Sequence, residues 1–461
     1  MKKLICIILF IFPVVAFTQQ PWYKYSPMNY AWHNAGDADF SAGGVEYISF
    51  AFSPSGQPYI AYSDLGNDMK ATVMKFDGNN WVNVGNAGFS TELAWYTSLA
   101  FSPTDSETYI AYQDAETFWK ATVMKFDGTN WVYVGNEGFS GGQVGYTSLA
   151  FSPSGEPYVA YADQMNLNQA TVMKFDGTNW GIVGSADFSP SEADFTSLAF
   201  NPVDSLPYVA YVDFDDSSKA TVMKFNGTDW VNIGHVGFSA GGAYYTSLAF
   251  SKSGQPYVAY SDGAYSSKAS VMKFDGTNWV YIGNAGFSAG SIGYMSLAFN
   301  PTNGQPYVAY QDAADSSKAI VMEFDGTNWV NIGTAGFSAK GVTYTSLAFS
   351  PSGSPYVAYS DAGDSDKATV MYYGASAGIR ELQSSQISIY PNPATNKITV
   401  EQSGETQESY LAILNIEGQQ LITHQITHIK TQIDISNLTG GVYFVRVTND
   451  RTVEVGKFMK N

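Results

Sequence analysis

Carboxylates are the side chains of this sequence that could carry acid–base chemistry. Aspartate and glutamate together number 41 among 461 residues, and the formal net charge is −18. Hydrolysis of a glycosidic bond needs only two carboxyl groups, provided that their pKa values differ. Besides aspartates that recur along the chain, the candidates are Glu46, Glu92, Glu116 and Asp194. Because a catalytic pair must be unique and most carboxylates recur, we expect a protein that is not an enzyme.

The residue types used for other chemistries are scarce. Cys6 is the only cysteine, and the histidines before residue 374 are His33 and His235. The sequence therefore lacks the residues that zinc or copper sites, thiol chemistry and Ser-His triads require. All three arginines lie beyond residue 373, so the preceding chain cannot hold a substrate carboxylate with an arginine cluster, as sialidases do. The negative charge argues against a nucleic-acid partner, which requires a basic surface.

Short acidic stretches offer hard oxygen ligands of the kind that Ca²⁺ prefers. The candidate ligands are Asp213, Asp215, Asp216, Asp361, Asp364 and Asp366. Neither stretch has the Asp/Asn-Gly-Glu spacing of a known calcium loop. Calcium therefore stays open on the sequence alone, and no other cofactor is expected.

Aromatic residues are the best candidates for a binding site. Trp95 and Trp119 occupy positions that hold polar or small residues in most other repeats, and Phe118 lies beside Trp119. Exposed indoles suit stacking against a sugar ring or anchoring of a protein contact. The alternative is that the two indoles pack on each other and fill a gap. Tyr244 and Tyr265 form a second candidate pair.

A repeat organises these residues. Tryptophan recurs every 49 or 50 residues, which indicates one supersecondary unit copied seven times. The seven positions are Trp32, Trp81, Trp131, Trp180, Trp230, Trp279 and Trp329. Most of the chain is therefore expected to be a single repeat scaffold.

The unit that begins at Tyr245 predicts four short strands, bounded by Gly, Pro, Asp or Ser. They span Tyr245–Ser251, Pro256–Asp262, Lys268–Phe274 and Trp279–Gly283. Tight turns join the first pair and the last pair, which makes neighbouring strands antiparallel and disfavours a stacked solenoid, the alternative. Both faces of each strand are apolar, so both faces of each sheet must be covered. We therefore predict an all-β, seven-bladed β-propeller with four antiparallel strands in each blade.

The repeat count predicts how the ring closes. The seventh unit stops after its third strand at Val370–Tyr373, whereas Trp32 aligns with Trp81 of the first complete unit. We therefore predict that the N-terminal segment supplies the outer strand of the last blade, which leaves no sheet edge exposed.

The connections between strands differ in how much they vary. The tight turns lie on one face, whereas the connections after the second and fourth strands lie on the opposite face and vary freely. Variable loops on a rigid scaffold usually carry binding, so we expect a ligand there. Each second strand ends in Asp, and in six units Lys follows six residues later. We interpret this Asp as a turn cap that forms a partly exposed ion pair with the Lys.

The two ends of the chain differ from the repeat. A charged start and the apolar stretch Leu4–Phe17 indicate a signal peptide over residues 1–18. This stretch is too short for a transmembrane anchor, so no transmembrane segment is expected after its removal. We assign residues 19–373 to the propeller, 374–386 to a linker, and 387–461 to a small Ig-like β-sandwich.

The last segment resembles a known family. Its motifs are, in order, Tyr390-Pro391-Asn392-Pro393-Ala394, Ile416-Glu417-Gly418, Ile433-Asp434-Ile435-Ser436, Gly441-Val442-Tyr443, and a tail with Lys457 and Lys460. They are similar to those of the type A C-terminal sorting domain of the Bacteroidota type IX secretion system. The resemblance implies contact with that machinery, export across the outer membrane, and release or attachment at the cell surface. The repeats resemble seven-bladed bacterial propeller repeats of unassigned role, from which no site is carried over.

These observations predict a secreted or cell-surface propeller that binds a glycan or another surface macromolecule. One alternative is a structural or adhesive surface protein without a small ligand, and another is a polysaccharide-active enzyme that uses two carboxylates. Aromatic loops exposed at equal depth on several blades would favour the first. A flat surface would favour the structural or adhesive protein. One deep cleft with two close carboxylates would favour the enzyme.

Overall fold

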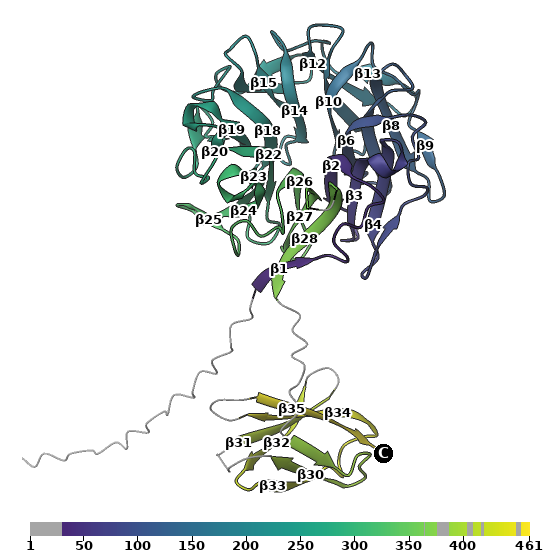
Figure 1. The fold of residues 1–461 in the computed structure, drawn as a ribbon, viewed down its shortest axis with the longest axis vertical. Helices are drawn as coiled ribbons and strands as arrows, with labels where there is room; N and C mark the ends of the chain where they lie inside the picture. Colours follow the sequence, from purple (N-terminus) through teal and green to yellow (C-terminus); the bar gives the residue numbers. More distant parts are fainter. Residues whose placement is uncertain (1–29, 364, 376–386, 403–408, 416–418, 449–452) are drawn as a thin grey trace, which may run out of the picture. The chain divides into compact units, whose positions relative to one another are not determined.

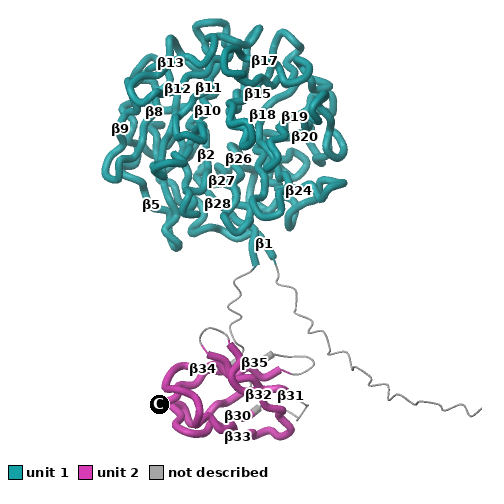
Figure 2. The backbone as a smooth tube through the Cα atoms, turned by 180° about the vertical axis from the view of Figure 1, so that it is seen from behind, with its two compact units in different colours: residues 1–376 teal, residues 377–461 magenta. Residues whose placement is uncertain are grey.

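The computed structural model describes residues 30–375, 387–402, 409–415, 419–448 and 453–461, with the exception of residue 364. The chain forms two compact units, residues 1–376 and residues 377–461 (Figure 2). The predicted signal peptide, most of the predicted linker, Asp364 and Gly418 lie outside the described residues.

The first unit is a β-propeller of seven four-stranded antiparallel sheets around a central axis (Figure 1), as the repeat predicted. In each blade the first strand lies next to the axis and the later strands follow outwards. Blade 1 contains β2 (Val45–Phe52), β3 (Pro58–Asp64), β4 (Lys70–Phe76) and β5 (Trp81–Asn83). Blade 2 contains β6 (Ala94–Phe101), β7 (Thr108–Asp114), β8 (Lys120–Phe126) and β9 (Trp131–Tyr133). Blade 3 contains β10 (Val144–Phe151), β11 (Pro157–Asp163), β12 (Gln169–Phe175) and β13 (Trp180–Ile182).

The remaining blades repeat this order. Blade 4 contains β14 (Ala193–Phe200), β15 (Pro207–Asp213), β16 (Lys219–Phe225) and β17 (Trp230–Asn232). Blade 5 contains β18 (Ala243–Phe250), β19 (Pro256–Asp262), β20 (Lys268–Phe274) and β21 (Trp279–Tyr281). Blade 6 contains β22 (Ile292–Phe299), β23 (Pro306–Asp312), β24 (Lys318–Phe324) and β25 (Trp329–Asn331). Blade 7 contains β26 (Val342–Phe349), β27 (Pro355–Asp361), β28 (Lys367–Ala375) and β1 (Tyr30–Asn34). Short 3-10 turns, η1 (Leu65–Asn67), η2 (Gly263–Tyr265) and η3 (Ala313–Asp315), follow three of the second strands.

The N-terminal strand closes the ring. β1 pairs antiparallel with β28, with Trp32 opposite Tyr373, and completes blade 7. The predicted closure is therefore confirmed. β28 continues to Ala375, opposite Tyr30, so the last propeller strand extends beyond the predicted boundary at residue 373.

The repeated tryptophan joins each blade to the one before it. Its indole Nε1 donates a hydrogen bond to a backbone carbonyl of the preceding blade, as Trp131 does to Val84 at 2.7 Å. The same contact recurs at all seven tryptophans. Each indole also stacks on a phenylalanine, as Trp131 does on Phe89 with ring centroids 4.3 Å apart. The period of the sequence thus marks a contact between blades.

A glycine that follows each of these tryptophans leaves room for the next indole. Gly85 has a φ of +72°, and a Cβ atom there would lie 3.0 Å from the Phe126 ring and 3.1 Å from the Trp131 indole. A side chain at this position would be both strained and crowded.

Hydrogen bonds also tie the innermost strands to one another around the axis. Ser49 Oγ on β2 accepts a bond from the Leu99 N–H on β6 at 2.9 Å, and Ser346 Oγ on β26 accepts one from the Phe50 N–H at 3.1 Å. Equivalent bonds join every pair of neighbouring innermost strands. The residues nearest the axis therefore sit on a closed, hydrogen-bonded frame.

The second unit is a small β-sandwich, as predicted. One sheet has the order β29 (Ile387–Tyr390), β30 (Lys397–Gln402) and β33 (Lys430–Asp434). The other has the order β32 (Gln420–Ile426), β31 (Ser409–Leu414), β34 (Gly441–Thr448) and β35 (Val453–Lys460). Side chains from both sheets form the core, among them Ile398, Leu411 and Phe458, which are fully buried.

Candidate functional site

A backbone bulge lies near the start of each innermost strand, on the variable-loop face, the face that carries the connections after the second and fourth strands. The pairing of β2 with β3 shifts between Glu46 and Ser49, and Tyr47 within the bulge has a φ of 53°. The same shift, with a φ of 52–56°, recurs in all seven blades. Positive φ is rare in residues other than glycine, so its sevenfold repetition indicates a specific structural purpose.

Aromatic residues occupy the seven bulges and form one closed circle around the axis, here called the axial ring. Its members are Tyr47, Tyr96, Tyr146, Phe195, Tyr245, Tyr294 and Tyr344. Neighbouring ring centroids lie between 4.7 Å (Tyr47 and Tyr96) and 5.4 Å (Tyr47 and Tyr344) apart. All seven side chains are half-buried, so each presents part of its surface.

Threonines of the neighbouring blades support this backbone. The Thr246 hydroxyl on β18 donates to the carbonyl of Phe195 on β14 at 2.6 Å, and Thr97 donates to the carbonyl of Tyr47 in the same way. At five of the seven bulges, the carbonyl displaced from sheet pairing thus accepts a bond from a threonine hydroxyl of the next blade. The axial ring is therefore held by the strands themselves rather than by loops.

The residue before each member of the axial ring differs from blade to blade. It is Glu46 in blade 1 and Asp194 in blade 4, two of the carboxylates that the sequence offered for acid–base chemistry. In the other blades it is Trp95, Gly145, Tyr244, Gly293 or Thr343. The repeat thus provides a uniform aromatic ring with a variable second row beside it.

The Asp194 carboxyl has an unusual electrostatic environment. Burial, with a further contribution from the charge of Glu192, raises the pKa of Asp194 to about 6, while interaction with the Tyr146 hydroxyl opposes this shift. Asp194 in turn raises the pKa values of Tyr96 and Tyr146, for which burial is the larger cause. Asp194 therefore changes charge near pH 6 beside the aromatic ring.

Glu46 lies against a different arc of the axial ring. Burial, and then the charge of Asp366, raise the pKa of Glu46 above its ordinary value. Burial raises the pKa of Tyr47 to about 12, with Tyr96 and Glu46 adding to the shift. Burial followed by Glu46 also raises the pKa of Tyr344. The hydroxyls of Tyr47 and Tyr344 are consequently neutral donors at physiological pH.

The predicted tryptophan pair adjoins the axial ring. The Trp95 and Trp119 rings pack on each other with centroids 4.6 Å apart, which is the alternative arrangement considered from the sequence. Trp95 also stacks on Tyr47 at 6.1 Å, and both indoles are half-buried. Phe118 beside them is 84% exposed. The structure therefore joins Trp95 and Trp119 into one aromatic strip, and the exposed Phe118 adjoins it as the chain neighbour of Trp119.

The second predicted pair is less coherent. Tyr244 and Tyr265 are both partly exposed on blade 5. Tyr244 meets Phe195 of the axial ring edge-on at 6.4 Å, whereas Tyr265 meets Tyr281 of the outer strand at 6.2 Å. Tyr244 thus extends the axial ring, and Tyr265 lies towards the rim.

Exposed apolar side chains also mark the rim of the variable-loop face. They follow the second strands of five consecutive blades, at Leu65, Phe118, Met165, Leu167, Phe214 and Tyr265. Blades 6 and 7 begin the same connection with Ala313 and Ala362. This series of side chains is called the apolar arc.

The aspartates that end the second strands are buried caps. Asp64 is 1% exposed, and its oxygens accept bonds from the Gly66 N–H and the Thr72 hydroxyl, both at 3.0 Å. Lys70 lies opposite Asp64 in the sheet, but among the described residues no ion pair joins such an Asp to its Lys. The predicted cap is confirmed and the predicted ion pair is wrong, because loop amides and a threonine already satisfy the carboxylate.

The acidic stretches considered for calcium do not assemble a ligand set. Ser191 donates to Asp213 at 2.8 Å and accepts from the Asp215 N–H at 3.0 Å, while Asp216 lies beside Gly237. In the second stretch, Asp361 caps the Gly363 N–H, Asp366 lies near Glu46, and Asp364 is not described. Among the described residues, no three acidic, histidine or cysteine side chains gather to hold a metal ion. We propose no metal site.

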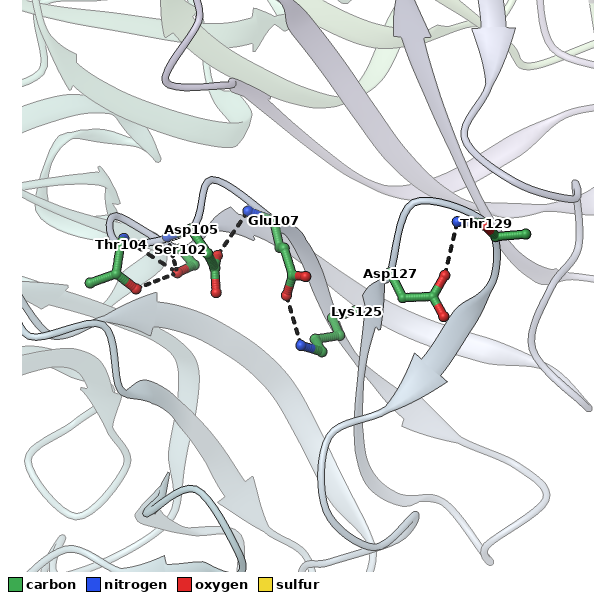
Figure 3. Close-up of polar contacts among 7 residues, drawn as sticks. All are labelled: Ser102, Thr104, Asp105, Glu107, Lys125, Asp127 and Thr129. Atoms are coloured by element: carbon green, nitrogen blue, oxygen red, sulfur yellow. Dashed lines mark hydrogen bonds and ion pairs between the residues drawn. The ribbon is translucent and has the colours of Figure 1, made fainter.

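The opposite face, formed by the tight turns, is regular. Figure 3 shows its turns in blade 2, where Asp127 accepts a bond from the Thr129 N–H at 2.8 Å and Lys125 pairs with Glu107 at 2.7 Å. Shallow grooves next to Tyr158 and Tyr208 separate neighbouring blades there. Because the turns are nearly the same in every blade, we place no site on this face.

The first and the last of the predicted sorting motifs meet at the last strand of the second unit. Asn392, between Pro391 and Pro393, donates to the Lys457 carbonyl at 3.1 Å and accepts from the Met459 N–H at 2.9 Å. The first motif of the unit therefore clamps the C-terminal strand.

Other motif residues stabilise the same sandwich. Asp434 caps the Ser436 N–H at 2.8 Å, the Tyr390 hydroxyl donates to Glu401 at 2.9 Å, and Gly441 begins β34. The Tyr443 hydroxyl donates to the Thr439 carbonyl at 2.8 Å, and Lys460 is 9% exposed.

Residues 388–461 match the model of the secretion system C-terminal sorting domain. The second unit is a type IX secretion sorting domain. The sorting domain implies interaction with the type IX machinery and secretion of the chain to the cell surface or exterior. Within the described residues, no helix has the length and apolar character needed to cross a membrane. No curated protein sequence matches the chain.

One solved structure shares the propeller fold, and two others are similar to this chain at lower TM-scores. The BP39L lectin from Burkholderia pseudomallei has a TM-score of 0.53 and 14% identity, over 73% of this chain and 98% of the lectin. PorZ, a surface component of the type IX secretion system of Porphyromonas gingivalis, has a TM-score of 0.46 and 15% identity over 90% of this chain. The chain spans 59% of that PorZ structure. An ulvan lyase of family PL25 has a TM-score of 0.49 and 13% identity, over 73% of this chain and 95% of the lyase.

Proposed function

We propose that the propeller binds a carbohydrate at the axial ring, on its variable-loop face. The observation that carries this proposal is the closed circle of seven half-buried aromatic side chains. Aromatic faces stack on the apolar faces of sugar rings, while tyrosine hydroxyls and carboxylates bond to sugar hydroxyls. Secretion by the sorting domain would bring this face into contact with extracellular glycans.

The aromatic strip of blade 2 extends the proposed site outwards. Tyr47 contacts Trp95, and Trp95 contacts Trp119, so aromatic surface continues from the axis to the loop that carries Phe118. Such a strip offers stacking positions beyond the axial ring. It favours an oligosaccharide as the ligand over a single sugar.

The fold comparison supports the same class of ligand. BP39L is a lectin, and this chain shares its propeller fold. Since fold alone does not define a site, the proposal rests on the aromatic residues of this chain and transfers no binding residue from the lectin.

The positions of the two axial carboxylates favour binding over hydrolysis. Glu46 belongs to blade 1 and Asp194 to blade 4, and they affect different tyrosines of the axial ring. Rings spaced about 5 Å apart form a circle about 12 Å across. Glycosidase carboxyl groups lie about 5–10 Å apart and act on each other's pKa values, whereas the charges that act on Glu46 and Asp194 are those of Asp366 and Glu192 respectively.

A binding screen tests the proposal. The purified full chain would be applied to an array of oligosaccharides, beside Tyr47→Ala/Tyr96→Ala and the control Tyr133→Ala. Tyr133 is a partly exposed tyrosine on β9, the outer strand of blade 2. We expect at least a tenfold loss of affinity in the ring variant and none in the control. Unchanged binding by the ring variant would refute the axial site.

A protein partner is the second candidate function, and the apolar arc favours it. Single exposed apolar residues are common, but a series along five adjacent loops is typical of a contact surface. Leu65→Ser/Leu167→Ser, at two exposed positions of the apolar arc outside the aromatic strip, would then abolish adhesion to surface proteins and leave oligosaccharide binding intact. Adhesion that survives this change would remove the apolar arc from consideration.

A further inference from the structure

We infer that the sugar held at the axial ring carries a protonated amine, as an amino sugar without an acetyl group does. This inference rests on the proposed carbohydrate site and concerns the chemistry of its ligand. It follows from the charges beside the axial ring, from the geometry of the ring, and from the distribution of basic residues.

The charges beside the axial ring are negative. Glu46 and Asp194 border it, and the charged groups that act on them are Asp366 and Glu192. Within the described part of the chain, no basic side chain lies within ion-pair distance of Glu46 or Asp194. Their negative charge is therefore available to a cation on a ligand.

The axial ring adds a second attraction that is independent of the carboxylates. Aromatic faces carry negative potential and bind ammonium groups that lie within about 6 Å of the ring centroid. The spacing of neighbouring rings gives the circle a radius of about 6 Å. An ammonium group inside this circle would thus lie within about 6 Å of several ring centroids, and the rings whose faces it meets would attract it.

The basic residue nearest the axial ring in sequence is Lys340, before β26, and its side chain lies beside Gly363 in the connection after β27. The arginines lie beyond residue 373, and lysines such as Lys70 and Lys120 begin third strands, two strands from the axis. Acidic sugars would therefore meet repulsion without a compensating cation, and neutral sugars would gain only stacking and hydrogen bonds. A protonated amino sugar satisfies both the carboxylates and the aromatic faces.

Isothermal titration of the purified full chain at pH 7 tests this inference. The probes are a β-1,4-linked glucosamine oligomer, its fully N-acetylated counterpart, and a neutral glucose oligomer of the same linkage. The variant Glu46→Gln/Asp194→Asn removes both axial carboxylates and keeps the shape of their side chains. Thermal melting of each variant checks that the propeller remains folded.

Blade 4 provides a matched control. Asp229 lies on the tight-turn face, where five other blades carry asparagine at the same position, so Asp229→Asn makes the same chemical change as Asp194→Asn within the same blade. It should leave binding of all three probes unchanged.

We expect the glucosamine oligomer to bind at least tenfold more tightly than the acetylated one, and this preference to disappear in Glu46→Gln/Asp194→Asn but not in Asp229→Asn. Equal affinities for the two oligomers, or a preference that survives loss of the axial carboxylates, would overturn the inference and leave the carbohydrate site standing. Failure of every oligomer to bind would overturn both.

Discussion

The indole Nε1 of Trp32 donates a hydrogen bond of 2.8 Å to the carbonyl of Ile332, across 300 residues of sequence. The same indole stacks on Phe337 with ring centroids 3.9 Å apart. Trp32 lies on β1, at the beginning of the propeller, whereas Ile332 and Phe337 follow blade 6. The contact that every other blade makes with its predecessor in sequence is therefore made here between the two ends of the propeller.

Substitution Trp32→Phe should weaken this closure. It leaves the Ile332 carbonyl without its donor, which should lower the free energy of unfolding by roughly 1–3 kcal/mol. Because β1 is joined to its own blade only through β28, amide hydrogen exchange should accelerate in these two strands first. Trp180→Phe removes the equivalent bond to Val134 at a continuous part of the chain and is the control. If amide hydrogen exchange accelerated equally around the mutated blade in both variants, the contact that closes the ring would have no special role.

The repeat architecture could be predicted because the residues that make the contacts between blades recur at the same spacing in every unit. Trp81 and Gly85, for example, serve the contacts between blades, and their spacing recurs with them. Strand ends were less predictable. The innermost strand of blade 5 begins at Ala243 instead of Tyr245, and its outer strand ends at Tyr281 instead of Gly283, where a φ of +68° turns the chain.

The axial ring could not be predicted from alternation along a strand. Tyr47 and its equivalents sit in bulges, where the two-residue periodicity is interrupted. The sequence did contain a signal, because the position that Tyr245 occupies at the start of its unit is aromatic in every unit, with Phe195 as the single non-tyrosine. The prediction of Asp-Lys ion pairs was wrong for a different reason. The strand register places Lys70 opposite Asp64, but it does not reveal that the Thr72 hydroxyl binds the carboxylate instead.

The axial ring should depend on aromatic faces more than on hydroxyls. Phe195 already replaces tyrosine in blade 4 and keeps centroid distances of 4.9 Å to Tyr146 and 5.0 Å to Tyr245. Tyr96→Phe should therefore change the free energy of unfolding by less than about 0.5 kcal/mol. Tyr96→Ser removes the ring contacts and should cost roughly 1–3 kcal/mol. Chemical denaturation measures both, and equal losses would show that the hydroxyl is the important group.

The sorting domain gives a prediction for export. Asn392→Ala removes two hydrogen bonds to the last strand, to the Lys457 carbonyl and from the Met459 N–H. The sorting domain should lose roughly 1–3 kcal/mol of stability, and less protein should reach the medium of a host with type IX secretion. Gln425→Ala, at an exposed position on β32, is the control. If a destabilised Asn392→Ala domain were exported normally, the secretion machinery would not depend on the stability of the sorting domain for recognition.

Asp194 should make the stability of the propeller depend on pH. Its pKa is raised from 3.8 to about 6 in the folded chain, so between these values the folded state retains a proton that the unfolded chain has released. Stability must therefore fall as pH rises from about 4 to 6 and stay lower above that range. Asp194→Asn lacks this titration and should melt at a higher temperature than the unmodified chain at pH 7.5, with little difference at pH 4. A variant that is less stable at pH 7.5 would show that the ionised carboxylate stabilises the fold.

The same titration should control binding of a cation. Choline keeps its charge at every pH, so any pH dependence of its binding reports on the protein. As pH falls through about 6, Asp194 gains a proton and choline affinity should fall severalfold. In Asp194→Asn the affinity should be low at pH 7.5 and nearly constant down to pH 5, whereas Asp229→Asn should retain the full dependence. Glu46→Gln leaves Asp194 in place and should therefore lower affinity without removing the midpoint near pH 6. A midpoint that persists in Asp194→Asn would assign the titration to another group and refute the role of Asp194.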